Sequence, residues 1–472
     1  MTFRGSQKVK YLAWVFHADF GSQESPISST SSGVGTPHLV ADVAAQALPK
    51  LLSITPAEEE SLLNLYFDTI HRAFPLFLEF QVHGRVNGGT EAVAGCSRDL
   101  IQTLVVITAR LSGFPLSSVT ELELDKHIDQ VLSSAYLQED ITGDAPSLDQ
   151  FRKSCLLVFY EYHQCPGYQA WARIGKLVRW AYWTGLDQLD RLHKISPLWN
   201  NMSEDVLEEW RLVWWRIYCL DSYANLSTGM PYQIDESLVN TSLPRRPAPE
   251  SNRRICLPHH KDGLLQLVQD ALSGSTPHAA AWEIQLISHT ILRHVGRALR
   301  LQSPDLLDEN IEYLKDTERR LSAIRLALPG NYFNPRRNAF ANESTYDHHF
   351  RLVTVHHILM ARLLVALINC ARLVEGQVWL QNWQQVFEIC QDVAAIAKEW
   401  NGIFCLRVDP ALVIIAFVSL IFLALHGKFA CSNVEENSSL RLEIEHCQTV
   451  LLLFLDQFGT AWTLPRLLKQ GP

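Results

Sequence analysis

Residues 211–235 read RLVWWRIYCLDSYANLSTGMPYQID, and they form either the wall of an active site or the central helix of a large helical fold. Apolar and aromatic side chains recur at helical spacing on most sides of this segment. One face holds Trp210, Trp214, Ile217 and Tyr218, and another holds Leu212, Trp215, Cys219 and Leu226. A helix that is apolar on most sides is buried on most sides. Gly229 suits the left-handed C-terminal position and Pro231 cannot continue a helix, so the segment predicts a central packing helix that ends there.

Asp221 is an acidic residue within this apolar segment. A lone buried carboxylate is very costly, so Asp221 needs a cationic or multiply hydrogen-bonded partner. We expect Arg179 to be that partner, with Arg211 as the second choice. The alternative is that Asp221 is a catalytic acid. We favour an ion pair that joins two helices.

The preceding segment, residues 168–185, has Trp171, Gly175 and Arg179 on one helical face. A glycine inside a helix costs roughly 1 kcal/mol relative to alanine. The usual compensation is the close approach of another helix, which we therefore expect at Gly175. Gly185 is expected to end this helix.

Helical patterns continue along the rest of the chain, and no convincing run of alternating strands interrupts them. They lie at residues 97–111, 121–137, 148–164, 279–301, 304–327, 346–375, 379–400, 410–426 and 439–459. The fold class predicted is all-α, a large multi-helix regulatory domain.

The folded part is expected to begin at Thr55. Thr55 as N-cap, Pro56 at the first helical position and Glu58 three residues after the cap form a capping box. Residues 1–50, which include the Ser/Gly/Pro tract at 21–37, are expected to be a disordered N-terminal segment and linker. Residues 51–472 are expected to form one helical domain.

Composition excludes several classes of function. The formal net charge is -9, so the chain lacks a strongly basic surface for nucleic acid. None of the ten cysteines forms a CxxC pair, and their apolar neighbours indicate buried thiols in a reducing compartment. The apolar run at 411–425 spans about 22 Å as a helix, short of the roughly 30 Å hydrocarbon core, so we expect a buried core helix and no membrane partner.

The sequence lacks the common motifs of catalytic and cofactor-binding sites. The sequence has no phosphate-binding glycine-lysine loop, no HExxH, no GxSxG and no aspartate-rich metal motif. His348, His349, His356 and His357 form a cluster, but no carboxylate ligand stands at helical spacing, and packing is favoured over metal binding. We therefore predict no catalytic, cofactor-binding or metal-binding residues.

Three blocks of this sequence resemble the middle homology region of fungal-specific transcription factors of the binuclear zinc-cluster family. The blocks are LLNLYFDTIHRAFPLF, YQAWARIGKLVRWAYWTGLD and EEWRLVWWRIYCLDSYANLSTGMPYQIDESLVNTSLP, within residues 55–250. The matching motif positions are Tyr66, Phe67, His71, Phe74 and Pro75; Trp171, Gly175, Arg179 and Gly185; and Arg211, Trp214, Trp215, Asp221, Gly229, Pro231 and Asp235.

The resemblance implies an all-helical regulatory domain and a transcription regulator that is not an enzyme. It implies location in the nucleus and a pathway-specific role, such as control of a secondary-metabolite gene cluster. The partners it implies are DNA, a small-molecule effector, and a second copy or a related chain in a homo- or heterodimer.

Family members commonly carry an amino-terminal zinc cluster of six spaced cysteines, whereas the first cysteine here is Cys96. Two interpretations follow. Either the cluster is encoded upstream of this sequence, in which case zinc would be bound there, or the protein is a cluster-less co-regulator that reaches DNA through a partner protein. An all-α enzyme of specialised metabolism is the alternative from another class.

Overall fold

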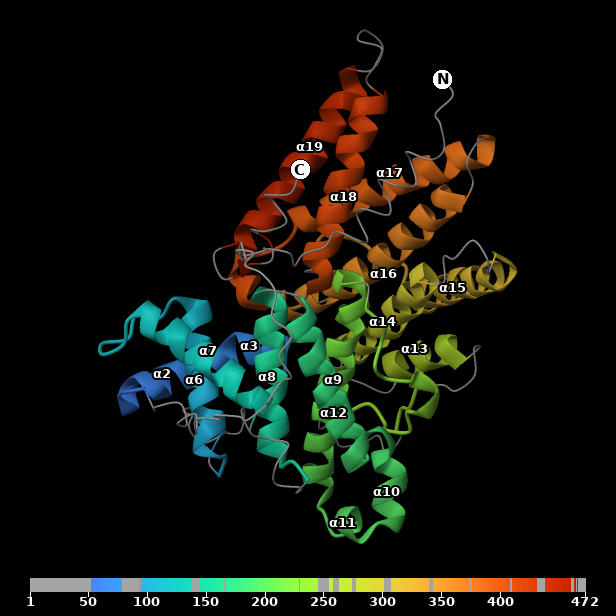
Figure 1. The fold of residues 1–472 in the computed structure, drawn as a ribbon. Helices are drawn as coiled ribbons and strands as arrows, with labels where there is room; N and C mark the ends of the chain where they lie inside the picture. The colour runs from blue at the N-terminus through green and yellow to red at the C-terminus, as the bar shows by residue number, and fades with distance from the viewer. Residues whose placement is uncertain are drawn as a thin grey trace, which may run out of the picture.

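The computed structural model of the chain is built from helices throughout the residues that it describes (Figure 1). These residues are 52–78, 93, 95–137, 145–164, 167–228, 230–244, 254–257, 263–273, 277–300, 307–338, 343–372, 376–407, 410–430, 438–459, 462, 463 and 465. No strand occurs in these ranges, and the predicted all-α class is confirmed. The segment 1–50 and Gly229 lie outside the described residues.

The first helix, α2 (Pro56–Asp68), begins with the predicted capping box. The Thr55 hydroxyl accepts a hydrogen bond from the Glu58 N–H at 3.3 Å, and the Glu58 carboxylate accepts one from the Thr55 N–H at 2.9 Å. The helix buries Leu62, Leu63, Tyr66 and Phe67. A short helix, α3 (Ile70–Ala73), follows it.

Four helices continue from there: α6 (Arg98–Ser112), α7 (Glu121–Leu137), α8 (Leu148–Gln164) and α9 (Tyr168–Thr184). Helix α2 packs on α6, α6 packs on α8, and α8 packs on α9. A compact turn follows α9, made of η1 (Leu186–Gln188), α10 (Leu189–Ile195) and α11 (Pro197–Asn200). It leads the chain into the long segment that contains the two adjacent tryptophans.

That segment is α12 (Glu204–Thr228), a helix of 25 residues. Trp214, Trp215 and Tyr218 are fully buried in it. Burial on most sides follows from its neighbours, because α12 contacts α8, α9, α14 and α18. The segment is therefore the central packing helix that its apolar pattern predicts. After it, η2 (Glu236–Leu238) lies within an extended stretch that returns along the helix.

The C-terminal half consists of α13 (Gly263–Ser273), α14 (Pro277–Arg300), α15 (Leu307–Ala327), α16 (Thr345–Arg372), α17 (Gln377–Lys398), η5 (Gly402–Arg407), α18 (Pro410–Ala430) and α19 (Ser438–Phe458). Helix α14 packs on α12 and, more extensively, on α16. Buried side chains from both halves of the described chain belong to one continuous hydrophobic core. In Figure 1, α14 lies between the green helices around α12 and the orange to red helices α16–α19.

Two helices, α16 and α18, are long and apolar enough to cross a membrane by length and composition. Within their most apolar windows, 89% of α16 and 56% of α18 is buried inside the fold. Helix α18 is longer than the apolar run at 411–425, because it continues to Ala430. Both helices use their apolar surface to pack on α17.

Candidate functional site

Asp221 is the centre of a buried polar network at the end of α12. Its side chain is fully buried, and its carboxylate accepts backbone hydrogen bonds from the segment that follows the helix. The Gln233 N–H lies 3.0 Å from Oδ1, and the Ile234 N–H lies 3.0 Å from Oδ2. The carboxylate therefore fastens the returning segment to the helix that precedes it.

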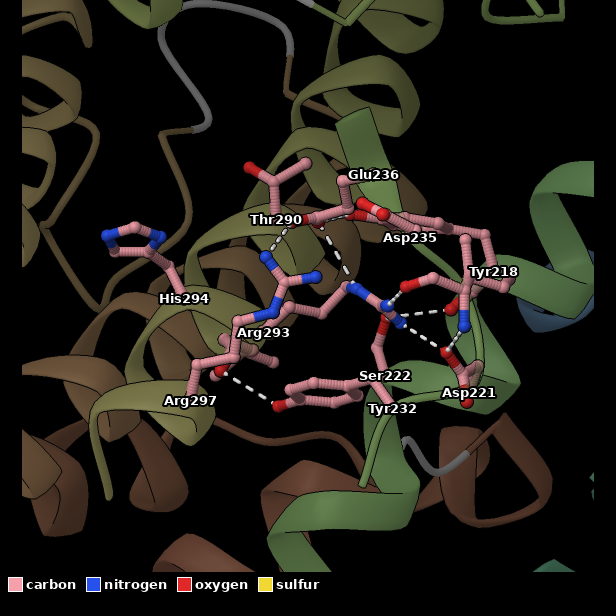
Figure 2. Close-up of polar contacts among 12 residues, drawn as sticks. Tyr218, Asp221, Ser222, Tyr232, Asp235, Glu236, Thr290, Arg293, His294 and Arg297 are labelled. Atoms are coloured by element: carbon pink, nitrogen blue, oxygen red, sulfur yellow. Dashed lines mark hydrogen bonds and ion pairs between the residues drawn. The ribbon is translucent and has the colours of Figure 1, made fainter. Parts of the chain in front are cut away.

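Arg293 of α14 completes this network from the other half of the chain (Figure 2). Its Nη1 lies 2.7 Å from Asp221 Oδ2, and its Nη2 donates to the Ile234 carbonyl at 2.7 Å. Its Nε forms an ion pair with Glu236 Oε1 at 3.2 Å. Both Arg293 and Asp221 have side chains that are 0% exposed, so the pair joins two helices inside the core.

Aromatic rings enclose the Arg293 guanidinium. Its central carbon lies 4.7 Å from the ring centroid of Tyr218 and 4.3 Å from that of Tyr232. A desolvated cation beside a ring gains about 2 kcal/mol or more of cation–π attraction. The Tyr218 hydroxyl donates to Glu236, which also pairs with Arg297 of α14 through Oε2 at 3.2 Å. Glu236 thus bridges two arginines that stand one helical turn apart.

The pKa values of the arginine and the two tyrosines in this network all lie above their usual range. Burial acts to lower the pKa of Arg293, but Asp221 and Glu236 outweigh burial and raise the pKa above its usual range. Burial raises the pKa of Tyr218, and the carboxylate of Glu236 adds to the rise. Burial also raises the pKa of Tyr232. The guanidinium of Arg293 and the hydroxyls of both tyrosines therefore keep their protons near pH 7, which suits a network that holds elements together.

The partner expected for Asp221 is wrong. Arg179 lies on an exposed position of α9, and the cation that reaches Asp221 is Arg293, 72 residues farther along the chain. Arg211, the second choice, is buried at the opposite end of α12. The predicted partners both lie in the motif segments, whereas the actual partner lies on α14, which packs on α12 from a later part of the chain.

Arg211 organises a second buried network near the start of α12. Its Nη1 lies 2.8 Å from Glu204 Oε1 and 2.7 Å from Glu208 Oε1, and its Nη2 lies 2.6 Å from Asp190 Oδ1. Burial acts to raise the pKa of Asp190, but the Ser242 N–H, at 2.6 Å from Oδ2, and Arg211 lower it overall. This network fixes α10 and the stretch around Ser242 to α12.

The two tryptophans of α12 take different roles. The Trp215 Nε1–H donates to the Ser242 carbonyl at 2.8 Å, so it holds the same stretch that Asp190 holds. Trp214 is fully buried and lies beside Tyr182 of α9, with ring centroids 6.2 Å apart. The hydroxyl of Tyr182 accepts from the Asp235 N–H at 2.9 Å, and the Asp235 carboxylate caps η2 by accepting from the Ser237 N–H at 3.0 Å. Asp235 therefore shapes the returning segment without entering the core.

The second sequence block contacts the returning segment as well. The Trp171 Nε1–H donates to the carbonyl of Pro231, which is exposed, at 3.4 Å. A Cβ at Gly175 would lie 3.3 Å from Arg179 Nη1 and 3.6 Å from Gln233 Oε1. The element that approaches Gly175 is therefore the segment after α12 and not another helix, which corrects the expectation. Gly185 ends α9 with a positive φ of 79°.

The first sequence block is tied to α12 through α8. Tyr66, Phe67, His71, Phe74 and Pro75 are all buried. The Phe77 N–H donates to His71 Nε2 at 3.2 Å, and Phe74 stacks on Phe159 of α8 with centroids 4.7 Å apart. Arg152 of α8 donates from Nε to the Leu76 carbonyl at 2.9 Å and forms an ion pair with Glu209 of α12 at 2.9 Å. The three blocks thus meet on α12.

The histidine cluster is dispersed among separate contacts on α16. His348 Nε2 lies 2.7 Å from the Pro335 carbonyl, and His349 packs on Phe404 with centroids 4.2 Å apart. The Nδ1 of His356 lies 2.8 Å from the Leu352 carbonyl. His357 Nδ1 lies 2.7 Å from Ser288 Oγ of α14. Within the described residues, no group of three or more histidine, cysteine, aspartate or glutamate side chains is placed to hold a metal ion.

Arg293, Glu236 and Arg152 are the site residues that motif reading missed. The signal for Arg293 was available, because it shares a helical face with Trp282 and Leu286, where a cation is out of place unless it is paired. The partner of Arg293 could not be predicted, since periodicity shows which face of a helix is buried but not which element covers that face.

Comparisons with known proteins support the resemblance. Residues 63–253 match the family model described as Fungal specific transcription factor domain. The chain is similar to Transcription factor FBD3 of Gibberella moniliformis, with 26% identity over 48% of this chain and 29% of the relative. No solved structure matches the chain.

Two further relatives carry names that mention biosynthesis. The citrinin biosynthesis transcriptional activator mrl3 of Monascus ruber is 26% identical over 40% of this chain and 36% of its own length. The ascochitine biosynthesis cluster transcriptional regulator of Didymella fabae is 28% identical over 42% of this chain and 33% of its own length. The match therefore spans about a third of each of these relatives.

Proposed function

We propose that this chain, which carries a fungal specific transcription factor domain over residues 63–253, is the regulatory part of a pathway-specific transcription regulator of a secondary-metabolite gene cluster. Support comes from relatives named for citrinin and ascochitine biosynthesis. The role is non-enzymatic and is exercised in the nucleus. Residues 51–472 act in it as one helical unit.

The observation that carries this proposal is the match of residues 63–253 to the family model, and the fully buried pair of Asp221 and Arg293 shows how that region is joined to the rest of the fold. The three motif blocks meet on α12, and the joint connects α12 to α14 and through it to the C-terminal helices. A ligand that binds to the C-terminal helices can thus change the conformation of the motif-bearing part through the packed helices between them. A ligand shifts such a system only by its differential affinity for two states.

DNA is reached, in this proposal, through a zinc cluster outside the sequence given or through a partner protein. The net charge of -9 supports this division of labour, and some exposed arginines are paired with acids, as in the Arg98–Glu59 pair at 2.6 Å and the Arg441–Glu445 pair at 2.8 Å. Paired arginines make weak phosphate contacts, because affinity for DNA depends on unneutralised cations.

The test is deletion of the gene, followed by sequencing of all transcripts and complementation. We expect transcripts of one co-located biosynthetic cluster to change several-fold and to be restored by the unaltered gene. Complementation with Arg293→Met should fail, whereas Arg441→Gln, an exposed pair on α19, should restore transcription. A fluorescent fusion should accumulate in nuclei. An unchanged transcriptome in the deletion strain, under conditions where the gene is expressed, contradicts the proposal.

A further inference from the structure

A cavity of about 300 Å³ opens on the C-terminal half of the molecule, away from the network around Arg293. It lies between α15, α16, α17 and the turn at residues 329–335. Its volume is at the lower end of the range of small-molecule sites, which is about 300–1,000 Å³. The cavity is therefore large enough for a small organic ligand.

The lining of this cavity is apolar on its inner side. Ile358 and Leu359 of α16 are each 2% exposed, and Ile396 of α17 is 3% exposed. Phe333 of the turn lies at the same cavity and is half-buried. Apolar and aromatic walls of this kind favour a flat hydrophobic body over a sugar or a free phosphate.

Three charged side chains also line the cavity: Arg325 of α15, Arg362 of α16 and Asp392 of α17. Arg362 Nη1 lies 3.8 Å from Asp392 Oδ2, whereas the buried Arg293–Asp221 pair is at 2.7 Å. The Asp392 side chain is 59% exposed and that of Arg362 is 29% exposed. The Arg362–Asp392 pair is thus long and partly exposed. With two arginines and one aspartate in its lining, the cavity carries an excess of one positive charge.

The electrostatics of Arg362 agree with this geometry. Burial is the largest cause and lowers the pKa of Arg362; Asp392 and Glu388 act to raise it, Arg325 lowers it further, and the net change is downward. The guanidinium therefore lacks the compensation that a close carboxylate would supply. A planar guanidinium binds a carboxylate through two parallel hydrogen bonds, so a ligand acid can give Arg362 what Asp392 does not.

We propose that this cavity binds a small organic anion, with a flat apolar body against Ile358, Leu359 and Ile396 and its carboxylate on Arg362. Arg325 adds long-range attraction, and Asp392 competes with the ligand. The inference rests on the proposed function, since it gives that regulator an effector class. It also gives the effector a route inward, because α16 packs on α14, the helix that carries Arg293.

The test uses the full chain and calorimetric titration with 2-naphthoate, with neutral 2-naphthamide as the matched probe of the same shape. We expect saturable binding of the carboxylate and weaker binding of the amide. Arg362→Gln should weaken naphthoate binding about tenfold, as expected for one charge-assisted contact. Asp392→Asn should tighten it about threefold, because a competing exposed charge is removed. Arg441→Gln, on α19, should change it less than twofold.

The opposite signs of two of these variants guard against misfolding as an explanation, since a damaged fold cannot tighten binding. Equal affinity for naphthoate and naphthamide overturns the proposal. So does naphthoate affinity that is unchanged in both Arg362→Gln and Asp392→Asn, or a lack of saturable binding by the unaltered chain and by Asp392→Asn.

Failure of this inference is distinct from failure of the proposed function. Naphthoate binding as described, together with an unchanged transcriptome in the deletion strain, removes the proposed function and leaves the binding site. A lost cluster transcript together with absent binding removes the binding site alone.

Discussion

At the scale of single residues, Asp221 and Arg293 are the clearest case of mutual dependence. Each is fully buried, and each leaves a desolvated charge if the other is removed. Breaking such a pair by removing one partner typically costs about 3–5 kcal/mol, even though replacing both with apolar groups can be nearly neutral. The energetic role of the pair therefore shows only when it is half removed.

Asp221→Asn is expected to lower the free energy of unfolding by about 3 kcal/mol, because Arg293 stays buried with a weakened set of counter-charges. Urea denaturation followed by tryptophan fluorescence measures it. Asp235→Asn is the matched control, since Asp235 is an exposed cap and Asn caps about as well as Asp, so the change should cost less than about 1 kcal/mol. The double variant Asp221→Leu/Arg293→Met should lose much less stability than the sum of the losses in the two single variants. Strict additivity would contradict the buried pair.

Gly185 is a residue where backbone and packing act together. Its φ is 79°, and a Cβ there would lie 2.2 Å from Leu192 Cδ1. Gly185→Ala is expected to cost about 2 kcal/mol, from left-handed strain plus displacement of the half-buried Leu192 side chain. Gly113→Ala is the control, since Gly113 has a φ of 66° and no atom within 4 Å of the added Cβ. Equal costs for the two variants would rule out the contribution of Leu192.

At the scale of elements, the start of α2 couples a cap to a distant loop. Glu58 accepts the Thr55 N–H within its own capping box, and its Oε1 accepts the Ser117 N–H at 2.7 Å. The hydrogen bond from the Ser117 backbone is the largest cause that lowers the pKa of Glu58 from 4.5 to about 2, and those from Thr55 follow. One ionised side chain thus joins α2 to the loop between α6 and α7.

This lowered pKa predicts a pH dependence. The ionised form is favoured in the folded chain, so the stabilisation is present above pH 4.5 and is lost as the pH falls through about 2. Glu58→Gln should therefore be less stable than the unaltered chain at pH 6, and the difference should shrink toward pH 2. Urea titrations at several pH values measure it. A difference that stays constant over that range contradicts an ionised Glu58.

Helices α12, α14 and α16 form a second unit at this scale. His357 of α16 lies 2.7 Å from Ser288 Oγ of α14, and Arg293 of the same helix reaches α12. Each of these helices buries apolar surface against its neighbour, so removal of one would expose apolar surface of the others to water.

At the scale of the whole molecule, this continuity predicts that the motif-bearing half depends on the C-terminal half. A chain of residues 51–253 leaves the sides of α12 that α14 and α18 cover exposed to water. We expect this fragment to show no cooperative thermal unfolding in circular dichroism, whereas residues 51–472 unfold in a sharp transition. A cooperative transition in the shorter fragment would establish the motif region as an independent domain.

Much of the architecture follows from local patterns. The capping box of α2, the ends of α9 at Gly185 and the depth of Trp214 and Trp215 were all readable from spacing and residue type. Helix α13 was not predicted, and α10 and α11 are too short for a period to emerge. The need for a cation beside Asp221 was also predictable from the sequence. The identity of that cation was not, because the prediction was Arg179 and the partner is Arg293.

The sequence by itself determined the helical class, the central place of α12 and the burial of its acid, because periodicity and residue chemistry act within a few turns of one helix. The tertiary structure decided that Arg293 meets Asp221, that Gln233 approaches Gly175, and that Arg325, Arg362 and Asp392 share one cavity. The physical reason is that partners far apart in the chain are selected by how helices pack, and packing depends on the shapes of all the buried faces together.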